Sequence, residues 1–149
     1  MNETPKQDTF LSLAEVLETA VQQCLNAERN LRGSLYQAGE PHTLALGEMA
    51  ESERKLAALL SGFADKMPDK VLATRFQYTL DSIEYPEPRD PFEAASRLIE
   101  VNERIVDDLR EQARNAVPAS VGEALDILWR DVEAMGRRIS MIHVTMHDA

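Results

Sequence analysis

The sequence has a single cysteine, Cys24, and therefore cannot form a disulfide within the chain. Aromatic residues reach only 5%, and this shortage favours helix packing over sheet packing. No stretch approaches the roughly 20 apolar residues that span a bilayer, and the first residues lack the basic region and apolar run of a signal peptide. We therefore expect a cytoplasmic protein in which Cys24 is a small core residue.

Basic residues are also few: 16 Lys and Arg stand against 26 Asp and Glu, so the formal net charge is −10. A surface of this sign repels nucleic acid and anionic lipid, so neither nucleic acid nor a membrane is an expected partner. The 149 residues, 44% of them apolar, are enough for one continuous core. We expect residues 1–149 to form a single domain.

The seven prolines leave long windows in which apolar residues recur at helical spacing. The halves 8–66 and 90–147 are each expected to hold two long helices, and a proline-rich connector, 79–90, joins them. Asp90, Pro91 and Glu93 indicate a helix start. No segment has the alternation of a strand, so the expected fold class is all-α. The predicted helices cover about residues 8–37, 42–64, 68–78, 91 to beyond 113, and 120–146.

One glutamate interrupts the apolar stripe of each long helix: Glu28, Glu53, Glu103 and Glu133. Residues three and four apart share a helix face, so these side chains are expected to point towards the interior or its edge. In an antiparallel bundle they would converge on one level. A buried carboxylate needs a partner, because an isolated charge in a core is costly.

This pattern resembles the ligand helices of rubrerythrins, which belong to the ferritin-like superfamily. The run Asn-Ala-Glu-Arg at 26–29 is echoed by Val-Asn-Glu-Arg at 101–104, and the runs 49–60 and 131–136 take the place of the second ligand helix. The resemblance covers roughly residues 8–146. It implies a ferritin-like four-helix bundle, made of two helix-hairpin repeats joined by a long crossover. The segment 70–78 also resembles the connector of a bacterial group of two-repeat, rubrerythrin-like bundles.

The chain departs from that family at both histidine positions of its ligand set, which hold Leu56 and Gly136. Di-iron proteins of this kind use four carboxylates and two histidines. Without the imidazoles, the glutamates would hold a divalent ion such as Mn²⁺, Mg²⁺, Ca²⁺ or Fe²⁺ only weakly. The alternative, which we favour, is that they pair with arginines of other helices and fix the register of the bundle. No cofactor and no catalysis are expected.

His143 and His147 are four residues apart on the last helix, a spacing that can chelate a transition metal. Their positive charge at a helix C-terminus would also complement the helix dipole, and we favour this second interpretation. Methionines and Trp129 on the same helix offer a soft apolar surface for a partner helix or for core packing.

The sequence therefore predicts a non-catalytic binding or protein-interaction module that uses a ferritin-like scaffold, with a homodimer or another protein as partner. One alternative is a divalent-metal-binding protein that uses the inner carboxylates. A second alternative is a small acidic chaperone or adaptor that presents a helix groove.

Overall fold

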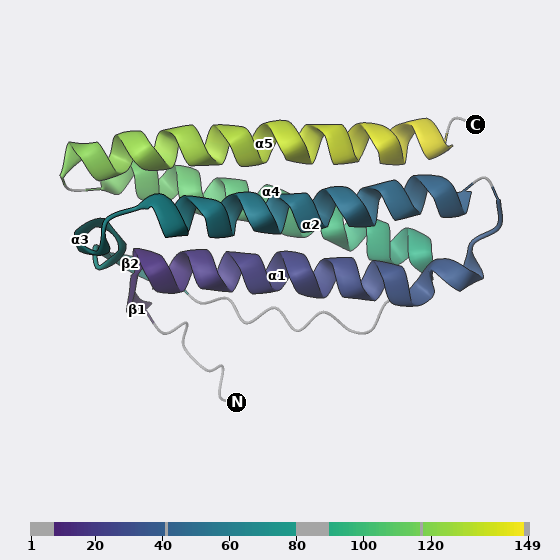
Figure 1. Ribbon diagram of the computed structural model, residues 1–149, viewed down its shortest axis with the longest axis horizontal. Helices are drawn as coiled ribbons and strands as arrows, with labels where there is room; N and C mark the ends of the chain where they lie inside the picture. Colours follow the sequence, from purple (N-terminus) through teal and green to yellow (C-terminus); the bar gives the residue numbers. More distant parts are fainter. Residues whose placement is uncertain (1–7, 41, 80–89, 117, 148–149) are drawn as a thin grey trace, which may run out of the picture.

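The computed structural model describes residues 8–40, 42–79, 90–116 and 118–147, and within these ranges the chain is mostly helical (Figure 1). The predicted all-α class is confirmed at this level. A two-stranded antiparallel ladder accompanies the helices. The elements are β1 (Asp8–Ser12), α1 (Leu13–Ser34), the 3₁₀ turn η1 (Leu35–Gln37), α2 (His42–Lys66), α3 (Asp69–Leu72), β2 (Arg75–Thr79), α4 (Pro91–Asn115) and α5 (Ala119–His147).

The four long helices lie side by side along the longest dimension of the molecule (Figure 1). Helix α1 packs mainly against α2 and α4, and α5 packs mainly against the same two helices. Helices α2 and α4 begin at the end of the molecule at which α1 and α5 finish (Figure 1). Each of these packed pairs is therefore antiparallel. None of the described helices combines the length and the apolarity needed to cross a bilayer.

The helix starts follow local capping chemistry. The Ser12 hydroxyl accepts from the Glu15 backbone N–H, and the Glu15 carboxylate accepts from the Ser12 N–H, which forms a capping box. Asp90 caps α4 in the predicted way, with Pro91 at the first helical position. Helix α5 begins at Ala119, one residue before the predicted cap at Ser120.

The ladder corrects two predictions, since residues 8–12 and 75–78 were assigned to helices and residue 79 to the connector. Strands β1 and β2 pair with Leu11 opposite Phe76, and the Leu13 N–H donates to the Thr74 carbonyl at 2.8 Å. Phe76 is buried in the core, whereas Phe10, which lies within the first predicted helix, is exposed. The capping box at Ser12 ends the extended segment, so the helix begins at Leu13 and not near residue 8. The connector 80–89 lies outside the described residues.

Leucine and alanine dominate the core between the long helices. Where α4 gives way to α5, the two backbones approach closely, because a Cβ at Gly122 would lie 2.8 Å from the carbonyl oxygen of Ala113. A glycine at this position therefore allows the tight α4–α5 packing. Fully buried members of the core include Leu13, Leu17, Leu31, Leu46, Met49, Leu56, Leu60, Leu98, Leu109, Leu125, Leu128 and Ile139.

Candidate functional site

Two of the four glutamates predicted to converge do so. Glu53 on α2 is 0% exposed and Glu28 on α1 is 9% exposed. They lie close enough for the charge of Glu28 to raise the pKa of the Glu53 carboxyl group. Glu103 is exposed, and Glu133 is half-buried with its carboxylate 2.7 Å from Arg137 of its own helix. Among the described residues, no three His, Cys, Asp or Glu side chains gather closely enough to hold a metal ion. The expected four-carboxylate layer is thus reduced to two.

Glu103 faces outwards because the buried face of α4 is wider than the predicted stripe and runs through Asn102 instead. That stripe placed Glu103 between Ile99 and Val106. One residue of helix corresponds to a rotation of about 100°, so Asn102 takes the inward position. Asn102 is a functional candidate that sequence reasoning missed, although the spacing of its apolar neighbours signals it. The buried positions step by four and three: Leu98, Asn102, Ile105, Leu109 and Gln112.

Glu53, Asn102 and Cys24 form an inner polar cluster that joins α2, α4 and α1. The Asn102 side-chain N–H donates to Glu53 Oε1 at 2.8 Å, and the Cys24 thiol is a further hydrogen-bond partner of the same carboxyl group. Glu53 Oε2 and Asn102 Oδ1 are buried without a hydrogen-bond partner. Glu53 is therefore held by an amide and a thiol, where an arginine of another helix was expected.

Burial raises the pKa of the Glu53 carboxyl to about 8, and the nearby Glu28 charge adds to the effect. The hydrogen bonds from Asn102 and Cys24 oppose it. The carboxyl group is consequently protonated and neutral at pH 7. Burial and the neighbouring Glu53 also raise the pKa of the Cys24 thiol, so the thiolate that would act as a nucleophile or metal ligand is disfavoured.

Glu28 lies at the edge of the core, where an arginine reaches it from its own helix. Arg32 Nε lies 3.3 Å from Glu28 Oε1, and Arg32 Nη2 lies 3.1 Å from Glu51 Oε2 on α2. Arg32 thus links α1 to α2 through two carboxylates. Because Arg32 is partly solvent-exposed, this bridge contributes little to stability, about 1 kcal/mol or less.

Leu56 and Gly136, which stand where rubrerythrins have the histidines of their ligand set, have different surroundings. Leu56 is completely buried in the core. Gly136 lines an open groove between α4 and α5, with a volume of 310 Å³, together with Asn102 and Glu133. A Cβ at Gly136 would lie 3.9 Å from the Asn102 Cβ, which is ordinary contact.

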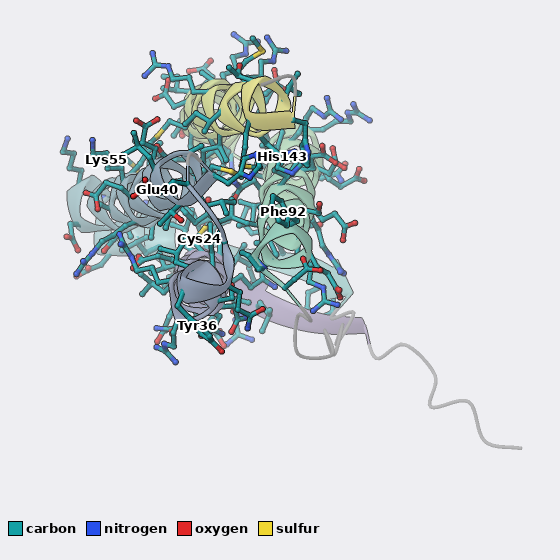
Figure 2. The ribbon with its side chains drawn as sticks, turned by 90° about the vertical axis from the view of Figure 1, so that its right-hand side faces the viewer. Cys24, Tyr36, Glu40, Lys55, Phe92 and His143 are labelled. Carbon is teal, nitrogen blue, oxygen red and sulfur yellow. The ribbon has the colours of Figure 1, made fainter. Side chains whose placement is uncertain are left out.

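All three histidines lie at one end of the molecule, where α2 and α4 begin and α5 ends. The end-on view shows His143 and Phe92 near each other at this end (Figure 2). The His42 ring is 5.5 Å from the Phe92 ring, and the His147 ring is 6.0 Å from it. The Nε2 atoms of His143 and His147 are 3.2 Å apart. His42, near the start of α2, is thus half-buried against Phe92.

Exposed apolar side chains gather at the same end of the molecule. Leu44 of α2 is 73% exposed, and Met141 and Val144 of α5 are 63% and 51% exposed. Beside them, an apolar hollow of 370 Å³ between α2 and α5 is lined by Ala45, Ile142 and Met146, among others. Trp129 lies elsewhere on α5, between two arginines.

The inner polar cluster thus brings together a carboxyl group with a raised pKa, an amide and a thiol, all inside the core. Comparisons with protein-family models, with curated proteins and with solved structures find no match to this chain.

Proposed function

We propose that the chain is a ferritin-like four-helix bundle that acts without catalysis as an interaction module. The packing supports this topology: α1 pairs with α2, α4 pairs with α5, and the two pairs pack through α1–α4 and α2–α5. Helix α2 finishes and α4 begins at opposite ends of the molecule (Figure 1). This arrangement is the one expected of two helix hairpins joined by a long crossover.

The observation that carries the non-catalytic part of the proposal is the state of Glu53. Its carboxyl group is completely buried, hydrogen-bonded to Asn102 at 2.8 Å, and neutral at pH 7 because burial raises its pKa to about 8. A metal ion at Glu53 would have to displace this proton and compete with the hydrogen bond from Asn102. The contacts around Glu53 instead suit a hydrogen-bonded layer that fixes how α2 and α4 meet.

The surface that supports an interaction role is the apolar face formed by Leu44, Met141, Val144 and the adjoining hollow. Isolated apolar side chains are common on protein surfaces, but here several gather beside an apolar hollow. We propose self-association through this face, because matching apolar faces of two copies would bury these side chains together.

The Glu53→Gln variant tests the absence of catalysis, because it keeps the size and neutrality of the protonated acid. Protein purified without chelator and supplied with Fe²⁺ or Mn²⁺ should contain no stoichiometric iron or manganese and turn over neither oxygen nor peroxide. The variant should behave in the same way as the wild type. Turnover or stoichiometric metal that disappears in Glu53→Gln would overturn the proposal and favour the metal-binding alternative.

Sedimentation over a range of protein concentrations tests self-association, at a salt concentration that screens the net charge of −10. Met141→Glu should shift the species towards the monomer. Ile127→Glu is the matched control, since Ile127 is an equally exposed residue on the same helix, away from this face. A wild-type monomer at every concentration, or equal effects of both variants, would rule out association through this face.

A further inference from the structure

Two imidazoles approach each other closely on the last two turns of α5. His143 and His147 are one helical turn apart, and their Nε2 atoms are 3.2 Å from each other. Their ring centroids are 4.5 Å apart, with the planes nearly perpendicular.

The distance between the two Nε2 atoms is close to that between two nitrogens bound to one metal ion. A zinc–imidazole bond is about 2.0–2.1 Å long, and two such bonds at a tetrahedral angle place the nitrogens about 3.3 Å apart. The observed 3.2 Å falls close to that value. The two nitrogens are at hydrogen-bond distance from each other, and rotation of the two rings can direct both towards one ion in place of this contact.

The two ligands differ in how far they are exposed. His143 is half-buried, whereas His147 is at the surface. The Phe92 ring packs against His147 and limits its orientations. His147 itself is exposed, so water can complete the coordination shell of a bound ion.

We propose that His143 and His147 form a binding site for a transition-metal dication of the Zn²⁺, Ni²⁺ or Cu²⁺ class. These ions accept imidazole nitrogen, whereas Mg²⁺ and Ca²⁺ require oxygen ligands, so the site discriminates against the latter two. The site is at the end of the bundle and is separate from the inner polar cluster. Both of its protein ligands come from one helix of one chain.

Calorimetric titration of the full chain, without an affinity tag, with NiCl₂ or ZnCl₂ tests the site. We expect one ion per chain for the wild type and no binding of Mg²⁺ at the same concentrations. His147→Ala and His143→Ala should each weaken binding at least about tenfold, because each removes one of two ligands. His42→Ala is the matched control, since His42 also packs on Phe92 but is not part of the pair, and it should bind as the wild type does.

Absence of binding, or equal affinity in the wild type and His147→Ala, would overturn the proposal. A folding defect is separated from ligand loss by circular dichroism and by the milder His147→Gln variant, whose position is exposed. The electron paramagnetic resonance spectrum of bound Cu²⁺ gives a second readout. Coupling to two nitrogens in the wild type and to fewer in His147→Gln supports the site, and an unchanged spectrum contradicts it.

Discussion

The Asn102 side chain donates a hydrogen bond to Glu53 across the middle of the core, between two residues 49 positions apart in the chain. The bond connects α2 with α4, the two helices whose backbones otherwise make few contacts. A neutral carboxyl group and an amide therefore link the two hairpins from inside. Several consequences of this arrangement can be measured.

Replacing Glu53 by glutamine should make the protein more stable at alkaline pH. The pKa of Glu53 rises from an ordinary value of 4.5 to about 8 on folding. A raised pKa means that the stabilisation is complete below pH 4.5 and is lost as pH rises through about 8. Each pKa unit corresponds to about 1.4 kcal/mol, so the total is a few kcal/mol.

Urea unfolding at several pH values between 5 and 9 measures this effect. The difference in unfolding free energy between Glu53→Gln and the wild type should grow with pH and level off above pH 8. Glu103→Gln is the control for an exposed glutamate, and its difference should stay flat. A constant difference for Glu53→Gln would mean that the carboxyl group does not titrate in this range.

Replacing Asn102 by alanine should destabilise the protein, whereas the same change at its neighbour Glu103 should not. Asn102→Ala leaves the buried Glu53 oxygen without its donor, which costs about 1–3 kcal/mol. Glu103 is exposed, so Glu103→Ala should stay within about 0.5 kcal/mol of the wild type. Denaturant titration of both variants compares the two positions directly. A larger loss at Glu103 would contradict the orientation of α4 described above.

The sequence predicts most of the helical architecture because stripes, prolines and caps are local signals. The start of α4 at Asp90 and Pro91 is confirmed. The inward position of Asn102 was missed because Ile99, Glu103 and Val106 also follow helical spacing. Val106 is buried as predicted, but tertiary packing leaves Glu103 exposed and buries Asn102. An error of one residue turned Glu103 into a candidate ligand and concealed Asn102.

The strands were missed for a related reason. Phe10 continues the spacing of the α1 stripe, so a short extended segment resembles one more turn of helix. Pairing of β1 with β2 depends on residues more than 60 positions away, and short-range periodicity does not report such contacts. The proximity of His42 to Phe92 is equally non-local, since it arises from the start of α2 and the start of α4.

Adding a methyl group at Gly122 should destabilise the protein, and adding one at Gly62 should stabilise it. A Cβ at Gly122 would lie 2.8 Å from the backbone oxygen of Ala113, so Gly122→Ala should cost about 1–3 kcal/mol. Gly62 lies inside α2 with no atom within 4 Å of such a Cβ, so Gly62→Ala should gain about 0.5–1 kcal/mol through helix propensity. Thermal unfolding of the two variants provides the comparison, and shifts of the same sign would contradict it.

Cys24 should resist thiol reagents while the protein is folded. Its side chain is completely buried, and burial beside Glu53 raises the pKa of the thiol. Modification by a disulfide reagent at pH 8 should therefore be slow and limited by opening of the fold. In concentrated guanidinium chloride the reaction should become fast. Rapid labelling of the folded protein would show that the region around Cys24 opens easily.

The β1–β2 ladder joins the two ends of the α1–α2 hairpin. Pairing of Asp8–Ser12 with Arg75–Thr79 ties the start of α1 to the chain beyond α2, and so closes a loop on the order of 60 residues. The beginning of a chain usually frays, but here the first turn of α1 is fastened by the capping box and by the Leu13–Thr74 bond. Amide protons of β1, β2 and the first turn of α1 should consequently exchange with solvent together, as one foldon.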